Sequence, residues 1–182
     1  MKPILRLLGL VENALGWLAA LAMITMMLVV FCDVLMRYIF HSPLSWAYDL
    51  ISLYLVAAVF YFSLSAAYSE GAHVNVDILQ QTFPKTGIRL SEIVTTAVGT
   101  VIFVLIAWFG ALKTIEAFSE NDVLSGAIPW PTWPANALVP LGCGLLALRL
   151  AVHFVGHVID LATGSALIPL SIGHHGDKER FE

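Results

Sequence analysis

The sequence predicts an all-α integral membrane protein that crosses the bilayer with four transmembrane helices. Of its 182 residues, 59% are apolar and only 12% are charged, whereas soluble domains are about 25% charged. Four long runs carry almost no charge, and each has the roughly 20 residues that a helix needs to cross the hydrocarbon layer. Because lipid cannot pair with backbone N–H and C=O groups, each run must satisfy them within its own helix.

Charged residues and prolines mark the ends of the predicted helices. The helices are expected at about 10–40, 46–69, 90–117 and 134–159, in one transmembrane domain over 1–160 that is followed by a tail over 161–182. The first helix is longer than the bilayer is thick, because nothing breaks it before His41, Ser42 and Pro43, so tilt or protrusion should absorb the excess. Near its start, Glu12 and Asn13 interrupt an apolar stretch, which argues against a cleaved signal peptide.

The segment 74–84, between the second and third helices, is predicted to be a short amphipathic helix in the membrane interface. Val76, Leu79 and Phe83 recur at i, i+3 and i+7, which places apolar side chains on one face. Pro84 ends the segment. The alternation of apolar and polar residues over 74–77 leaves an extended start open.

The distribution of basic residues predicts the orientation of the chain, because Lys and Arg are enriched in cytoplasmic loops. With the N-terminus inside, seven of the nine basic residues are cytoplasmic, and only Arg37 and Lys113 are outside. Both termini and the tail are therefore predicted to be cytoplasmic. Trp46, Trp130 and Trp133 then lie at the outer ends of helices, where an indole ring suits the headgroup layer.

Composition and motifs disfavour several classes of function. The basic residues are scattered, so no patch suits nucleic acid. Cys32 and Cys143 lie in apolar runs without metal-ligand spacing; we expect free thiols and no bound metal, with a disulfide left open. The centres of the spans carry hydroxyl side chains such as Thr25 and Ser63 but almost no charge. Since ion-coupled carriers usually place ionisable groups or broken helices there, the chain alone has no evident ion-coupling site.

Three charged residues near the helix ends are candidates for a structural or partner-binding role. Asp33 and Arg37 are four residues apart, which suits an ion pair within one helix. Alternatively, Arg37 pairs with Asp49 at the start of the second helix, or with a partner subunit. Arg149 is expected to extend toward cytoplasmic headgroups, with a partner carboxylate or an anionic lipid as the alternative.

Two further groups have a plain and a functional interpretation. His153 and His157 share a helix face, and no other span supplies a histidine at that depth, so we expect no haem or metal ligand; a redox anchor is the alternative. Glu116, Glu120 and Asp122 give the loop before the fourth helix a negative balance. A solvated loop is expected there, and a docking surface for a soluble partner is the alternative.

An ordered set of short motifs resembles the small membrane subunit of tripartite ATP-independent periplasmic (TRAP) transporters. The resemblance covers roughly residues 5–160, and its fragments occur in the right order on the four spans. They are Arg37-Tyr38, Ser45-Trp46-x-x-Asp49, Gly71-x-His73-x-x-Val76-Asp77 up to Pro84, Ile128-Pro129 before Trp130, and Pro140-Leu141-Gly142 with Arg149. The family usually has Glu at the position of Asp49, so the shorter carboxylate makes a direct reach to Arg37 less assured.

The resemblance implies a non-catalytic subunit of a bacterial inner-membrane complex, without a cofactor of its own. Its expected partners are a large multi-span permease subunit, which carries the substrate and ion sites, an extracytoplasmic solute-binding protein, and membrane lipids. The complex would take up carboxylates at the expense of an ion gradient, with this subunit as scaffold. Gly71 would permit a tight exit from the second helix, and His73 and Asp77 would fix the interfacial segment or contact the large subunit; a polar face at the headgroups is the alternative. From a different class, a four-helix redox anchor that binds haem or quinone is the alternative function.

Overall fold

A computed structural model describes residues 2–69, 85–126 and 128–163 of the chain. Four of its helices are long and apolar enough to cross a membrane, over Arg6–Ile39, Ala47–Tyr68, Ile93–Ser119 and Trp133–Gly156, which confirms the predicted fold class. The elements in chain order are α1 (Lys2–Ile39), α2 (Ala47–Leu50), the π-helical turn η1 (Ile51–Leu55), α3 (Val56–Ser69), α5 (Lys85–Ser119), β1 (Val123–Leu124), β2 (Trp130–Pro131) and α6 (Trp133–Thr163). The predicted interfacial segment 74–84 lies outside the described residues, as does most of the predicted tail.

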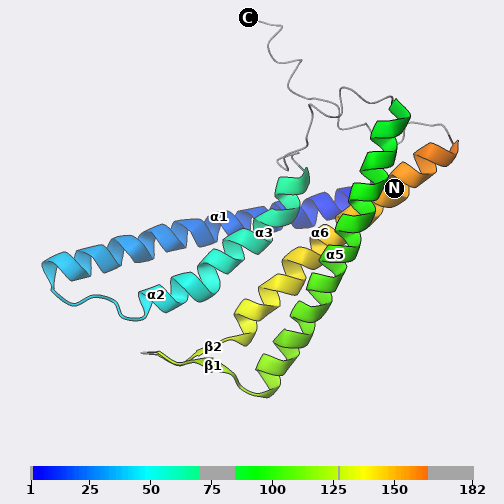
Figure 1. Ribbon diagram of the computed structural model, residues 1–182. Coiled ribbons are helices and arrows are strands. Elements are labelled where there is room, and N and C mark those ends of the chain that lie inside the picture. Colours follow the sequence, from blue (N-terminus) through cyan, green and yellow to red (C-terminus); the bar gives the residue numbers. More distant parts are fainter. Residues whose placement is uncertain (1, 70–84, 127, 164–182) are drawn as a thin grey trace, which may run out of the picture.

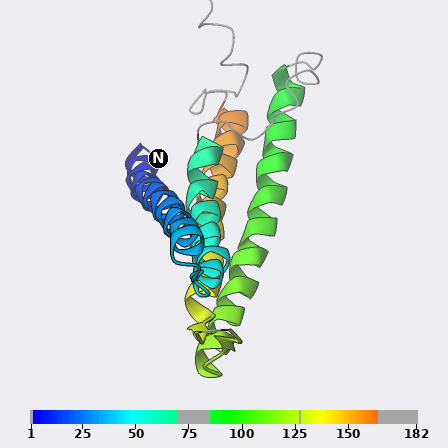
Figure 2. The same cartoon turned by 90° about the vertical axis from the view of Figure 1, so that its left-hand side faces the viewer.

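The helices form an open array in the order α1, α3, α6 and α5. Helix α1 packs against α3, α3 packs against α6, and α6 packs most extensively against α5. Figure 2 shows α1 and α5 on opposite sides of the central pair, and Figure 1 shows how the two hairpins diverge toward their loops. The core follows α6, whose buried residues include Ala135, Cys143, Leu146, Ala147 and Leu150. Helix α6 is therefore the central element of the array.

Small residues allow the central helices to approach closely. A Cβ atom added to Gly142 of α6 would lie 2.8 Å from the carbonyl carbon of Tyr61 in α3, too close for any side chain. A Cβ atom on Gly110 of α5 would lie 2.9 Å from a methyl group of Val139 in α6. Close backbone contact at small residues is how helices gain packing energy in lipid, where burial against a partner removes no apolar surface from water.

Two tight loops lie at one end of the array, which we call the loop end; the other end is the terminal end. After α1, His41 has a φ of 54°, and the N–H of Ser42 donates to the carbonyl oxygen of Met36 at 3.2 Å, which closes the last turn of the helix. Between α5 and α6, β1 and β2 pair antiparallel, with Leu124 opposite Trp130. The sequence did not predict this two-residue ladder or the turn η1.

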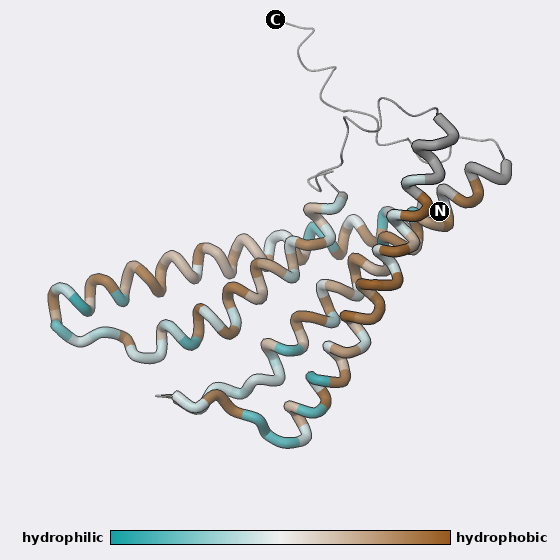
Figure 3. Tube along the Cα trace, in the orientation of Figure 1, coloured by the Kyte–Doolittle hydropathy of each residue, from teal (hydrophilic) through white to brown (hydrophobic). Residues whose placement is uncertain are grey.

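Many large apolar residues of the helices are exposed, and along the chain trace hydrophobic residues occupy the helices while hydrophilic residues gather near the loops (Figure 3). The exposed fractions are 72% for Trp17, 70% for Met27 and 65% for Phe109. Surfaces of this kind require lipid or another protein as their neighbour.

Candidate functional site

The Asp33 carboxylate organises the loop end of α1. Its Oδ2 accepts a hydrogen bond from Arg37 at 2.9 Å, and its Oδ1 accepts one from the backbone N–H of Leu44 at 2.8 Å. The Asp33 side chain is 18% exposed, whereas that of Arg37 is 61% exposed. The predicted ion pair within one helix is therefore present, and Asp33, rather than Arg37, fastens the loop that leads to α2.

Asp49 lies elsewhere at this end of the array. A Cβ atom on Gly126, in the loop between β1 and β2, would be 2.8 Å from Asp49 Oδ2, so the carboxylate faces that loop. The ion pairs of the described residues are Arg37–Asp33 and Arg149–Glu12, and the alternative pairing of Arg37 with Asp49 is not among them. The physical reason is that Asp33, one turn away on the same helix, already holds the Arg37 guanidinium.

Aromatic residues join the second span to the loop before α6. Within η1, the Tyr54 hydroxyl donates to the carbonyl oxygen of Pro131, and its ring meets that of Trp130 edge-on at a centroid distance of 5.8 Å. The wider turn of η1 contains this tyrosine, in agreement with the frequent occurrence of π-bulges at sites with a specific task. Trp133 packs edge-on against Phe118 of α5 at 5.6 Å. The Tyr54 contacts therefore join the two hairpins at the loop end, and the contact of Trp133 with Phe118 holds α5 to α6.

The remaining predicted site residues at the loop end lie closer to the surface. Ser45 and Pro129 are exposed, and Trp46 is half-buried. Tyr38, near the end of α1, is 76% exposed. Gly71, His73 and Asp77 lie outside the described residues, so their proposed roles stay predictions.

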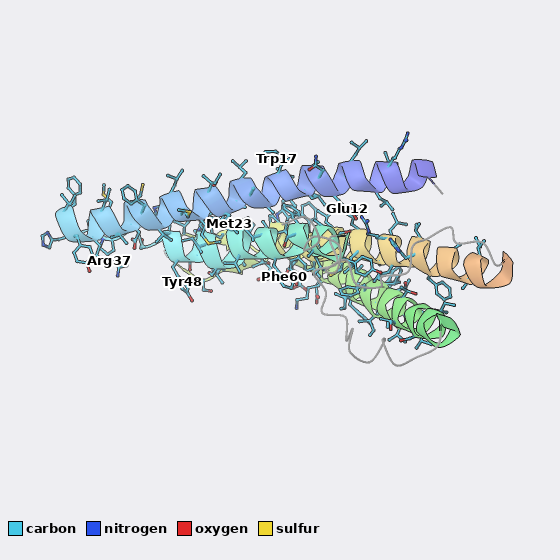
Figure 4. All side chains as sticks on the ribbon, turned by 90° about the horizontal axis from the view of Figure 1, so that it is seen from above. Glu12, Trp17, Met23, Arg37, Tyr48 and Phe60 are labelled. Atoms are coloured by element: carbon cyan, nitrogen blue, oxygen red, sulfur yellow. The ribbon has the colours of Figure 1, made fainter. Side chains whose placement is uncertain are left out.

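Near the terminal end, a buried ion pair joins three helices. Arg149 of α6 donates from Nη1 to Oε2 of Glu12 in α1, and the Ser65 hydroxyl of α3 donates to Oε1 of Glu12 at 2.6 Å. The side chains of Glu12 and Arg149 are 5% and 15% exposed. Figure 4 shows Glu12 on the side of α1 that faces the other helices, and Trp17 on the opposite side.

This ion pair corrects the preferred interpretation of Arg149. We expected its side chain to extend toward headgroups, and the structure instead supports the alternative, a partner carboxylate. The reason is geometric, because the packing of α1 beside α3 brings Glu12 within reach of α6. A guanidinium is more stable beside a carboxylate than in the hydrocarbon of the bilayer. Sequence reasoning missed Glu12 as a site, although a lone carboxylate within an apolar run was the available signal.

Three observations bear on the redox alternative. His153, one turn after Arg149 on α6, meets the ring of Tyr68 in α3 edge-on at 5.7 Å. Within the ranges 2–69, 85–126 and 128–163, no group of three His, Cys, Asp or Glu residues could hold a metal ion. Cys32 is exposed and Cys143 is buried, and both are free thiols.

Comparison with known proteins identifies the family. Residues 26–159 match the family model described as tripartite ATP-independent periplasmic transporters, DctQ component. The chain is also 27% identical over 157 residues to the sialic acid TRAP transporter permease protein SiaT of Haemophilus influenzae (strain 86-028NP), covering 84% of this chain and 24% of that protein. It thus spans about a quarter of the length of this curated relative. With four membrane-spanning helices and a match over most of its length, the chain belongs to the DctQ family, the small permease component of TRAP transporters.

Proposed function

We propose that this chain is the non-catalytic scaffold of a TRAP transporter that takes up a carboxylate at the expense of an ion gradient. In this role it holds a large multi-span permease subunit, to which a periplasmic binding protein delivers the solute. The observation that carries the proposal is the state of the buried charges: Glu12 and Arg149 neutralise each other across three helices. Ionisable groups within spans usually serve transport, and these serve cohesion.

The exposed apolar surface supports a membrane partner. Large apolar side chains are exposed along α1 and α5. A protein that moves solute alone needs polar groups that converge on a path. In the described spans, Glu12 and Arg149 instead tie helices together, and hydroxyl groups such as that of Thr100 donate to carbonyl oxygens of their own helix. This favours a structural role beside a larger subunit.

The loop end is proposed to face the periplasm, with both termini in the cytoplasm of a bacterial cell. Seven of the nine Lys and Arg residues lie toward the terminal end of the spans or beyond it, and only Arg37 and Lys113 lie at the loop end. This excess supports the proposed orientation. Among the predicted interface residues, Arg37 and Tyr38 are exposed, so we assign them contact with the large subunit. Asp33 holds Arg37 from within the chain.

The test is reconstitution of transport in liposomes. The large subunit and its binding protein are assayed with and without this chain, under a sodium gradient, against labelled carboxylates that include sialic acid. We expect uptake only when this chain is present and co-purification of the two membrane subunits. Full uptake without this chain would refute the scaffold role.

The alternative, a four-helix anchor for haem or quinone, is not favoured by the family. A visible absorption spectrum of the purified chain distinguishes the two functions, because bound haem gives a Soret band. The scaffold proposal predicts a spectrum without that band.

A further inference from the structure

An apolar groove runs between α5 and α6 toward the loop end. Its volume is about 450 Å³. At Gly110 the two helices approach closely: a Cβ atom there would lie 2.9 Å from Val139 and 3.3 Å from Pro140. The apolar part of the lining consists of Leu105, Ile106, Phe109, Gly110 and Val139.

Two polar residues, Lys113 of α5 and Asn136 of α6, complete the lining of the groove. Lys113 directly follows the uncharged run Ile93–Leu112, and a helical run of this length spans roughly the 30 Å of a hydrocarbon layer. The ammonium group is therefore at the depth of the headgroups. Apolar residues line the groove on the membrane side of it, over about two turns of α5.

Lys113 differs from the other basic residue at the loop end. Arg37 is held by Asp33, whereas Lys113 is exposed and takes part in neither ion pair of the described residues. A cation at the headgroup end of an apolar groove is complementary to an anionic lipid. The ammonium group can pair with the lipid phosphate, and the apolar lining can contact the acyl chain.

We propose that this groove binds an anionic phospholipid, with one acyl chain along α5 and α6 and the phosphate at Lys113 and Asn136. The charge of Lys113 favours phosphatidylglycerol over a zwitterionic lipid, and the Asn136 amide donates to a phosphate oxygen. The inference goes beyond the scaffold role and needs neither the proposed orientation nor the large subunit, because the groove lies within this chain.

The test uses native mass spectrometry of the full-length chain, titrated with phosphatidylglycerol or phosphatidylcholine of equal acyl chains. We expect tighter binding of phosphatidylglycerol and an approximately fivefold loss of its affinity in Lys113→Gln. Lys113→Arg should retain the preference. Equal binding of the two lipids, or an unchanged preference in Lys113→Gln, would overturn the proposal.

A second pair of variants tests the acyl-chain part of the groove. Leu105→Trp fills the groove and should weaken binding of both lipids, whereas Val104→Trp, at an exposed position outside the lining, should not. Loss in both variants or in neither would refute binding in the groove. In the complex with the large subunit, a photoreactive residue in place of Ile106 should form a lipid adduct; a protein crosslink would instead show that a partner helix occupies the groove.

Discussion

Removing the charge of Arg149 should strongly destabilise the fold. In Arg149→Met, Glu12 keeps the hydrogen bond from Ser65 at 2.6 Å but loses its countercharge while it is 5% exposed. Loss of one partner of a buried ion pair costs about 3–5 kcal/mol. Because Ser65 remains and the Arg149 side chain is 15% exposed, we expect the lower end, about 3 kcal/mol. For a chain of this length, that corresponds to a fall in Tm of about 6–12 °C.

The double variant Glu12→Leu/Arg149→Met separates the ion pair from the packing of its side chains. It leaves no unpaired charge, and replacement of a buried ion pair by apolar residues is often close to neutral. We expect its free energy of unfolding to lie within about 1 kcal/mol of that of the parent. The remaining loss arises because Ser65 no longer has its hydrogen-bond acceptor. The two substitutions should therefore be coupled by about 2 kcal/mol or more.

Thermal unfolding in detergent can be followed through Cys143, which is 2% exposed and reacts with a thiol-specific dye only when the helices separate. The exposed Cys32 is first replaced by Ser. Arg37→Met is the matched control, because the Arg37 side chain is 61% exposed. Ion pairs of exposed side chains contribute at most about 1 kcal/mol to stability. Equal losses in Arg149→Met and Arg37→Met, or a strictly additive double variant, would refute the buried pair.

Three further predictions concern contacts between helices and loops. Gly142→Ala should cost about 1–3 kcal/mol, because the new Cβ would lie 2.8 Å from the carbonyl carbon of Tyr61 and would force α3 from α6. Tyr54→Phe should cost about 1 kcal/mol, because it removes the hydroxyl that donates to Pro131. Asp33→Ala should lower the yield of the complex with the large subunit, because it frees the loop after α1. Thermal unfolding measures the first two, and co-purification measures the third.

Each of these predictions has a control in the same element or cluster. Gly144→Ala should be neutral or stabilising, since nothing lies within 4 Å of its added Cβ; a loss equal to that of Gly142→Ala would contradict the close contact. Tyr48→Phe should have no effect, because Tyr48 is 77% exposed. Arg37→Ala should reduce complex yield less than Asp33→Ala does, since of the two side chains only Asp33 bonds the loop backbone. A larger reduction in Arg37→Ala would show that Arg37, and not the loop held by Asp33, is the more important for assembly.

The fold class could be predicted because the bilayer leaves few choices. Runs without charge must be helices in lipid, and the charges that end them, such as Lys113, can be read directly. The i, i+4 spacing of Asp33 and Arg37 likewise predicted their pairing, since a helix fixes that distance. These inferences need only local geometry.

The ion pair between Glu12 and Arg149 could not be predicted in the same way. The two residues are 137 positions apart, and their meeting depends on the order of the helices in the array. The sequence shows that each charged residue interrupts an apolar run, where an unpaired charge is unfavourable. No rule based on local spacing predicts that the two residues pair. The ladder of β1 and β2 and the turn η1 were missed because they arise from contacts between loops and helices, such as that of Tyr54 with Trp130.

We expect the two polar ties on α1 to fix the depth of the chain in the membrane. Glu12 and Asp33 are 21 residues apart (33 minus 12), a helical distance of about 31 Å, close to the roughly 30 Å of the hydrocarbon layer. One tie holds α1 to α3 and α6, and the other fastens the loop after α1. Vertical displacement of α1 would pull one of them into hydrocarbon, at a cost of several kcal/mol. A constant depth of this kind would suit the scaffold role that we propose for this chain.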